Sequence, residues 1–238
     1  MKTSDKGVAF IVAHEGVVPG PYLDSVNVWT FGIGHTAAAG APIPADMPRG
    51  MPADLDAALR EAFAVFRHDL AKYEADVERA LGRTPVEQHE FDAAVSFHFN
   101  TGAIGRAAWV NLWKSGQKDA AAASMLANWR KPADIIGRRT AERNLFATGD
   151  YGKQGATVWH VNDKGRVVWQ IARKLSQSDI LALMGRDSRD PLTEIQTILH
   201  RLGLYTGRVD GIDGPKTQAA ITAFNAIAAE VAALQEDI

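Results

Sequence analysis

The stretch HEGVVPGPYLDSVNVWTFGIGHT, residues 14–36, places two carboxylates and a hydroxyl, those of Glu15, Asp24 and Thr30, within sixteen positions. A helix is expected to end directly after Glu15, because a glycine and then Pro-Gly-Pro follow it. The β-branched and aromatic residues beyond predict a β-hairpin over residues 22–35. The three side chains therefore surround a point where a helix gives way to strands.

This arrangement suits the hydrolysis of a glycosidic bond. The carboxyl end of a helix favours the uncharged form of the Glu15 side chain, which a general acid needs. Asp24 is expected at the solvent-exposed end of the first strand, and Thr30 on the returning strand can point toward it. Glycoside hydrolysis uses one acid and one carboxylate on opposite sides of the bond. Taken alone, however, a Glu and an Asp nine residues apart are more often ordinary surface residues.

Composition excludes several classes of protein. The 238 residues allow one large domain, or a medium and a small one, and the net charge of −2 gives no indication of nucleic-acid binding. Without cysteine there are no disulfides, thiolate metal sites or Cys nucleophiles. The histidines lack paired metal-ligand spacing, so we expect no metal and no cofactor. Neither a signal peptide nor a membrane-spanning segment is predicted, so stable membrane insertion is not expected.

The order of elements predicts an α+β fold that is mainly helical. The sequence predicts a first helix over 4–16, the hairpin, a Pro-rich loop over 37–52, and helices over 53–80, 86–99, 105–115, 117–127 and 136–147. A second hairpin is predicted over 156–169, where Asn162–Gly165 form the turn. We divide the chain into a domain over 1–175, a linker over 176–189 and a small helical domain over 190–238, with helices over 191–202, 215–225 and the tail 226–238.

The spacing of the first stretch resembles the active-site hairpin of the phage-type lysozymes, the muramidases of many endolysins. Eight residues separate Glu15 from Asp24 and five separate Asp24 from Thr30. Further residues that match the family pattern are Tyr22, Gly32, Gly34 and His35, the segment FHFNTG at 97–102, and the segment from Gly137 to Gly149. The resemblance covers about residues 5–150 and implies a lysozyme-like fold.

The resemblance also implies roles for individual residues. Glu15 would be the general acid, Asp24 would activate or orient water, and Thr30 would help to hold that water. The family inverts the anomeric carbon, which requires carboxyl groups roughly 6.5–9.5 Å apart. Arg138 is expected to form an ion pair with Glu15. The residues expected to bind substrate are Asn100, Trp29 and Arg138, although Trp29 fits a core position equally well. His35 is expected to be structural, closing the hairpin onto the helices.

Residues 190–225 resemble the small three-helix peptidoglycan-binding domain of wall-lytic enzymes. The residues that match are Gln196, Leu199, Leu202, Gly203, Tyr205, Gly207, Val209, Asp210, Gly211, Gly214, Pro215, Thr217, Ala220, Ile221 and Phe224. We expect a small core of Ile195, Leu199, Leu202, Ile221 and Phe224, and a structural role for Asp210 in its loop.

Together the two resemblances imply an endolysin that cleaves the β-1,4 bond between N-acetylmuramic acid and N-acetylglucosamine to lyse a bacterial host. The partner would be peptidoglycan, and the protein would be a monomer. It would stay in the host cytoplasm until a holin lets it reach the wall. The alternatives are a lytic transglycosylase, which uses one Glu and no water, a chitinase, and a wall-binding protein with a decayed active site.

Overall fold

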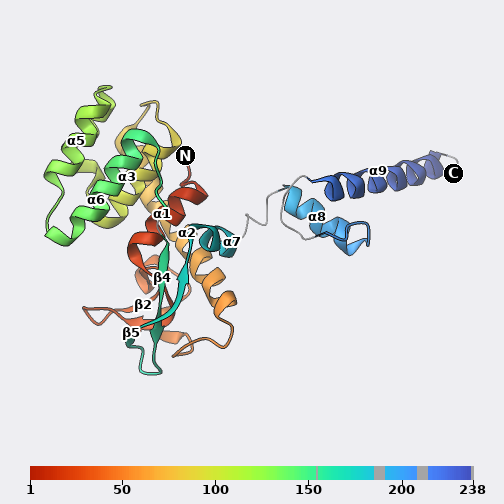
Figure 1. Cartoon of the computed structure of the whole chain (residues 1–238), viewed down its shortest axis with the longest axis horizontal. Coiled ribbons are helices and arrows are strands. Elements are labelled where there is room, and N and C mark those ends of the chain that lie inside the picture. Colours follow the sequence, from red (N-terminus) through yellow and green to blue (C-terminus); the bar gives the residue numbers. More distant parts are fainter. Residues whose placement is uncertain (154, 185–190, 208–213, 237–238) are drawn as a thin grey trace. The chain divides into compact units, whose positions relative to one another are not determined.

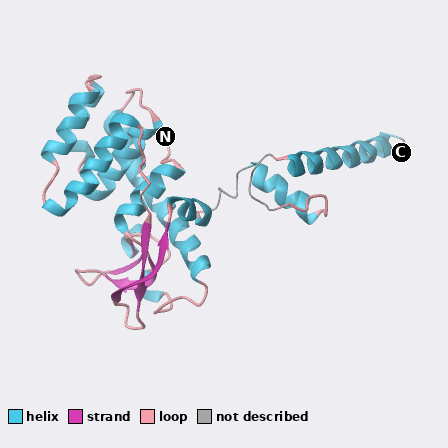
Figure 2. Ribbon diagram, in the orientation of Figure 1, coloured by secondary structure: helices cyan, strands magenta, loops and turns pink. Residues whose placement is uncertain are grey.

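In the computed structural model the described residues are 1–153, 155–184, 191–207 and 214–236. They form two compact units, Met1–Leu183 and Met184–Ile238. Figures 1 and 2 show that the first unit combines helices with a small region of strands, whereas the second is helical. The α+β fold predicted from the sequence is confirmed. Among the described residues, no helix is both long and apolar enough to cross a membrane.

The first unit begins with helix α1 (Asp5–Glu15) and a small antiparallel sheet. Ser4 caps α1 by accepting a hydrogen bond from the Gly7 N–H, and Gly16 ends it at φ 74°. The sheet has the order β1 (Val18–Leu23), β2 (Trp29–Gly32), β3 (His35–Thr36). The predicted start of the first strand at Tyr22 is wrong. Pro19-Gly20-Pro21 belong to β1 because an irregularity in the register between Val18 and Tyr22 accommodates prolines, which have no N–H to donate.

The long helices predicted for the middle of the chain are confirmed. They are α2 (Leu55–Leu81), α3 (Gln88–Thr101), α4 (Ala108–Lys114), α5 (Lys118–Asn128) and α6 (Ile136–Thr148). Short 3-10 turns precede α2, at Ala37–Ala39 and Pro44–Asp46, and precede α4 and α6, at Ile104–Arg106 and Ala133–Ile135. A capping box between Glu87 and Glu90 starts α3. Trp109 and Trp113 are fully buried and stack within the helical core, as expected for core tryptophans.

The second hairpin is longer than predicted, forms a sheet of its own and is hydrogen-bonded to the residue that precedes β1. It consists of β4 (Ala156–Val161) and β5 (Val167–Leu175). The Val17 N–H donates to the Thr157 carbonyl at 2.9 Å, and the Trp159 N–H donates to the Val17 carbonyl at 2.9 Å. These bonds attach β4 to the residues that connect α1 to β1, beside the expected active site (Figure 1).

The expected linker over 176–189 is wrong in its first half. Residues 177–183 form a helix, α7 (Gln177–Leu183), that packs on α1 and α2. Ser176 and Asp179 exchange hydrogen bonds that start the helix, and Ile180 and Leu183 are buried. The polar residues of this segment cap the helix, while Ile180 and Leu183, one helical turn apart, complete the core of the first unit. The division between the units therefore follows Leu183.

The described part of the second unit contains two helices, α8 (Pro191–Arg201) and α9 (Pro215–Glu236). The predicted helical tail is confirmed as a continuation of α9. The core contains Leu199, Tyr205 and Ala220, with Leu204 and Ile221 packed against them. Three residues expected in this core, Ile195, Leu202 and Phe224, are exposed, because Tyr205 and the small Ala220 fill the space between the helices. Val209, Asp210 and Gly211 lie outside the described residues.

A buried polar bond joins the two helices of this unit. The Gln196 side-chain amide is fully buried and donates to the Thr217 hydroxyl at 2.9 Å. Both residues belong to the pattern that resembles the wall-binding domain. Because a buried amide without a partner is costly, this bond fixes how α8 and α9 pair.

Candidate active site

The Asp24 carboxylate is built into the turn between β1 and β2. Its Oδ1 accepts hydrogen bonds from the N–H groups of Val26 at 2.9 Å and Val28 at 2.8 Å. The Asp24 N–H donates to the Val28 carbonyl, and Asn27 takes a positive φ of 61° to close the turn. The side chain that sequence reasoning selected for chemistry is therefore also held in one position by the backbone.

Thr30 lies on the neighbouring strand, paired with Tyr22 of β1. Its side chain is buried, and its hydroxyl donates to the Val28 carbonyl at 3.1 Å. Burial raises the pKa of Tyr22 to about 12, with contributions from the charges of Asp24 and then Glu15. The Tyr22 phenol therefore lies within the electrostatic field of both carboxylates.

Glu15 is held by an arginine of α6, as the sequence predicted. Its side chain is 28% exposed and forms an ion pair with the 6% exposed side chain of Arg138. The same guanidinium donates to Glu142 at 2.9 Å and to the Ser96 carbonyl at 3.3 Å. Glu142 and Ser96 fix the orientation of Arg138. Through Arg138 the end of α1 is joined to α3 and α6.

Glu142 is the centre of this network and is fully buried. It accepts from the Ser96 hydroxyl at 2.7 Å and also pairs with Arg138 and Arg139. Burial alone would lower the pKa of Arg138, but the Glu142 and Glu15 carboxylates outweigh it and raise the pKa above its ordinary value. For Arg139, burial prevails and lowers the pKa, although Glu142 opposes it.

Asn100 is connected to the same network from the end of α3. Its Oδ1 accepts a hydrogen bond from Arg139 at 2.7 Å, and the residue is exposed. The Arg139 guanidinium also lies 4.6 Å from the Phe97 ring centroid, which holds it against the core. With Oδ1 turned toward Arg139, the amide nitrogen of Asn100 is the group presented outward.

His14 precedes Glu15 but faces a different environment. It packs edge-on against Phe10, and its Nε2 is buried with no hydrogen-bond partner among the described residues. Burial, and then the positive charges of Arg138 and Arg139, lower the pKa of His14 to about 4. The His14 imidazole is therefore neutral near pH 7. It lies beside the network of Arg138, Arg139 and Glu142 and forms none of its hydrogen bonds.

Trp29 packs against the second hairpin. A Cβ at Gly165 would lie 2.5 Å from two atoms of the Trp29 ring, and the guanidinium of Arg49 lies 4.7 Å from the ring centroid. The Leu23 N–H also donates to the Gly165 carbonyl at 2.8 Å. Trp29 thus joins the β1–β2 hairpin to the turn of the β4–β5 hairpin and stays half-buried.

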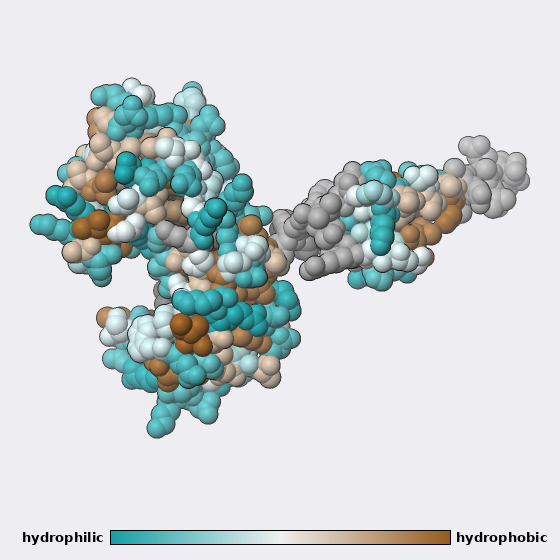
Figure 3. All heavy atoms as spheres, in the orientation of Figure 1, coloured by the Kyte–Doolittle hydropathy of each residue, from teal (hydrophilic) through white to brown (hydrophobic). Residues whose placement is uncertain are grey.

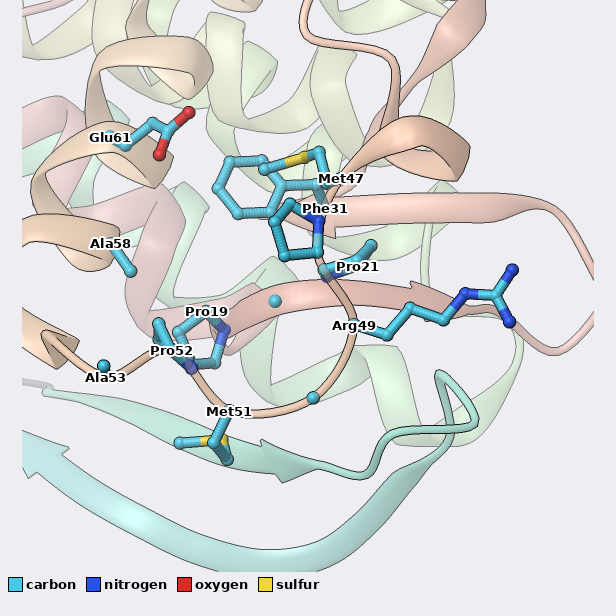
Figure 4. Close-up of a pocket in the computed structure, with 13 residues that line it drawn as sticks. Pro19, Pro21, Phe31, Met47, Arg49, Met51, Pro52, Ala53, Ala58 and Glu61 are labelled. Atoms are coloured by element: carbon cyan, nitrogen blue, oxygen red, sulfur yellow. The ribbon is translucent and has the colours of Figure 1, made fainter.

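The Pro-rich loop encloses a pocket of about 280 Å³ on the sheet. Figure 4 shows residues that line it, among them Pro19, Pro21 and Phe31 of the sheet and Met47 and Met51 of the loop. The residues that line the pocket do not include Glu15, Asp24 or Thr30. The loop therefore shapes the sheet next to Trp29 and does not enclose the expected catalytic residues in this pocket.

His35 has the structural position predicted for it. It is buried, with Nδ1 2.7 Å from Asp69 of α2 and Nε2 2.7 Å from the Pro42 carbonyl. These contacts join β3 to α2 and to the start of the Pro-rich loop.

Figure 3 shows that the surface of the first unit is hollowed between its helical part and its sheet part. Sequence reasoning singled out Glu15, Asp24, Thr30, Asn100 and Arg138, and the structure joins Glu15 to Arg138 and Asn100 to Arg139. It missed Glu142 and Ser96, which complete the network around Arg138. Glu142 is part of the GRRTAERNLF segment that was recognised, but a carboxylate four residues after an arginine is also typical of an exposed helix pair. Its burial depends on tertiary packing.

Comparisons with known proteins agree with this geometry. The phage lysozyme family model matches residues 12–142, and the model of a peptidoglycan binding domain matches residues 188–226. The endolysin of Bacillus phage B103 is 26% identical over 196 residues, which are 75% of this chain and 70% of that protein.

Solved structures also resemble the chain. The endolysin from Escherichia coli O157:H7 phage FAHEc1 has a TM-score of 0.55 and 26% identity, over 64% of this chain and 98% of that one. The muramidase domain of SpmX from Asticaccaulis excentricus has a TM-score of 0.50 and 29% identity, over 62% of this chain and 98% of that one. Since the family model covers more than half of the sequence, the chain belongs to the phage lysozyme family and is a glycoside hydrolase.

Proposed function

We propose that the chain hydrolyses the β-1,4 bond between N-acetylmuramic acid and N-acetylglucosamine in bacterial peptidoglycan, with Glu15 as the general acid. The observation that carries this proposal is the position of Glu15 at the end of α1. Its carboxyl is partly exposed and held by Arg138, which Glu142 and Ser96 orient in turn. A fixed, accessible carboxyl can protonate the leaving oxygen of the sugar.

Asp24 is the carboxylate that activates or orients the attacking water. Both backbone N–H groups that bind it donate to Oδ1. Oδ2 is therefore the oxygen positioned to accept from water. Thr30, one strand away, helps to hold that water. Inversion at the anomeric carbon would follow if the two carboxyl groups are roughly 6.5–9.5 Å apart across the bound sugar.

Asn100, Trp29 and Arg138 are proposed to support substrate binding in different ways. The outward amide nitrogen of Asn100 suits a carbonyl or hydroxyl oxygen of a sugar. Arg138 acts through Glu15, because its N–H groups already donate to Glu15, Glu142 and Ser96. Trp29 shapes the sheet beside the sugar from its position between Arg49 and Gly165.

The second unit is proposed to anchor the enzyme to its insoluble substrate. Residues 190–238 would bind the wall and residues 1–183 would cleave it, so that binding raises the local concentration of enzyme on peptidoglycan. We further propose that the protein acts as a monomer, waits in the cytoplasm of a bacterial host and reaches the wall through a holin. The likeness to phage endolysins supports this role in host lysis. Co-expression with and without a holin tests it, since lysis should require both proteins.

The test of the catalytic proposal is Glu15→Gln in the full-length chain. Loss of a general acid should reduce hydrolysis of purified peptidoglycan by about 10²–10⁴-fold. Sedimentation of the variant with insoluble walls should be unchanged, because the wall-binding residues are intact. Glu61→Gln, which changes a carboxyl of the Pro-rich-loop pocket, is the matched control and should retain full activity. Wild-type rates in Glu15→Gln would contradict the assignment.

A further inference from the structure

The β4–β5 hairpin lies beyond residues 12–142, which match the lysozyme family, yet it contacts the backbone next to the proposed general acid. The indole Nε1 of Trp159 lies 3.1 Å from the position that a Cβ on Gly16 would occupy. Gly16 directly follows Glu15 in the chain. A glycine at this position therefore lets a tryptophan from a distant hairpin pack against the end of α1.

Trp159 connects this position to a second, exposed tryptophan. The rings of Trp159 and Trp169 meet edge to face, with 5.5 Å between their centroids. Trp169 is 75% exposed, and its neighbours Val168 and Ile171 are 45% and 47% exposed. Three exposed apolar residues within four positions of one strand, unlike single ones, indicate a surface that binds a ligand or a partner.

The backbone at Trp169 is unusual for a large side chain. Its φ is 53°, in the left-handed region that favours glycine. The strand pairing shifts here, because Trp159 pairs with Ile171 while Val161 pairs with Val167, which leaves extra residues in β5. A bulge of this kind redirects a side chain. Backbone strain at an exposed aromatic residue is typical of positions kept for function rather than for packing.

The charge of the hairpin suits an anionic ligand. Residues 156–175 carry four Lys or Arg and one Asp, but Arg173 is paired with Asp56 and Lys174 donates to Thr157, so Lys164 and Arg166 are the cations of the turn. Arg166 lies at the turn, 3.4 Å from the Asn27 side chain of the catalytic hairpin, and Lys164 beside it is exposed. The glycan strand of peptidoglycan offers apolar sugar faces together with carboxylates, which belong to its peptide stems or, where a stem is absent, to the lactyl groups.

We propose that Trp159 and Trp169, with the basic residues of the β4–β5 turn, form an additional sugar-binding surface that extends the active site along the glycan strand. Aromatic rings bind sugars by packing against their C–H faces, and Trp offers the largest such area with a polar N–H at its edge. The occupant is the strand being cut, because Trp159 packs beside Gly16, the residue that directly follows Glu15. This inference rests on the proposed function and names a further part of its binding site.

The test uses full-length enzyme and a soluble, peptide-free hexasaccharide of alternating N-acetylglucosamine and N-acetylmuramic acid. Trp169→Leu keeps an apolar side chain but removes the ring, and it should raise KM about fivefold to tenfold with kcat within about twofold of wild type. Trp169→Tyr keeps a ring and should retain a KM near that of wild type. The midpoint of thermal unfolding, measured for each variant, verifies that the fold is intact.

A binding measurement separates this proposal from the proposed function. In a Glu15→Gln background, calorimetry with the same hexasaccharide should show weaker binding when Trp169 is replaced by Leu. If wild type cleaves neither purified peptidoglycan nor the hexasaccharide, the proposed function fails, whatever the variants do. If wild type cleaves it and Trp169→Leu shows an unchanged KM and Kd, the sugar-binding surface is refuted. A change of oligomeric state in sedimentation with unchanged KM would instead make the surface a contact between copies, which also overturns the proposal.

Discussion

The two hairpins of the first unit have the same turn but different side chains. In the first, Asp24 accepts from the N–H groups two and four residues ahead, and Asn27 takes a φ of 61°. In the second, Asn162 accepts from the N–H groups of Lys164 and Arg166, both at 3.0 Å, and Gly165 takes a φ of 69°. An amide oxygen and a carboxylate oxygen therefore serve this turn equally well. We therefore expect that folding does not need the charge of Asp24, which leaves the carboxylate available for chemistry.

Exchanging the side chains of Asp24 and Asn162 gives the largest expected effect on activity. Asp24→Asn should keep the turn, since Asn162 already forms it, but should reduce hydrolysis by at least about 100-fold because no carboxylate remains to activate water. Asn162→Asp makes the reverse change in the second hairpin and should leave activity within about twofold of wild type. Both rates are measured on purified peptidoglycan, together with the midpoints of thermal unfolding. An active Asp24→Asn variant would show that the carboxylate is structural.

Substitutions at the equivalent positive-φ positions of the two turns should differ in their effect on the free energy of unfolding. Gly165→Ala places a methyl group 2.5 Å from the Trp29 ring at a φ of 69°, and should cost on the order of 3 kcal/mol of unfolding free energy. Asn27→Gly changes the matching position of an exposed turn and should shift stability by less than about 0.5 kcal/mol. Urea unfolding of both variants measures the difference. Equal effects would mean that the second turn does not pack on Trp29 in solution.

A fall in pH should reduce the free energy of unfolding, because His14 lies near the end of α1 from which the first hairpin starts. The pKa of His14 is lowered from 6.5 to about 4 in the folded chain, so as pH falls below 6.5 the unfolded chain takes up the proton first. Stability is therefore complete above pH 6.5 and is lost progressively toward pH 4. Discounted for its partial exposure, the loss is on the order of 2 kcal/mol.

A pair of variants isolates this contribution. His14→Gln should flatten the dependence of unfolding free energy on pH between 6.5 and 4, the window set by the pKa of His14. His68→Gln, on the exposed surface of α2, is the control and should leave the dependence as in wild type. The measurement is urea unfolding at several pH values. An unchanged slope in His14→Gln would place the source of the pH dependence elsewhere.

Local sequence predicted most of the elements and the chemical side chains. Glycine positions define the ends of α1, α3 and α6, and the spacing of Glu15, Asp24 and Thr30 identified the hairpin that we propose to be catalytic. The failures share one cause: they depend on contacts between segments distant in sequence. The attachment of β4 to Val17, the packing of α7 on α1 and the burial of Glu142 between two arginines each need the folded core. The polar residues at 176–179 predicted a linker. They start a helix instead because α7 packs on α1 and α2, and this packing surface exists only in the folded core.

The most direct measurement is mass spectrometry of soluble products after full-length enzyme digests purified peptidoglycan in water enriched in ¹⁸O. Hydrolysis by a water molecule held at Asp24 and Thr30, with Glu15 protonating the leaving sugar, predicts reducing muropeptides that carry one ¹⁸O at the newly formed end. Glu15→Gln should give none of these products. Anhydro-muropeptides without ¹⁸O would contradict the proposed mechanism, because they form by intramolecular attack and leave no role for water at Asp24.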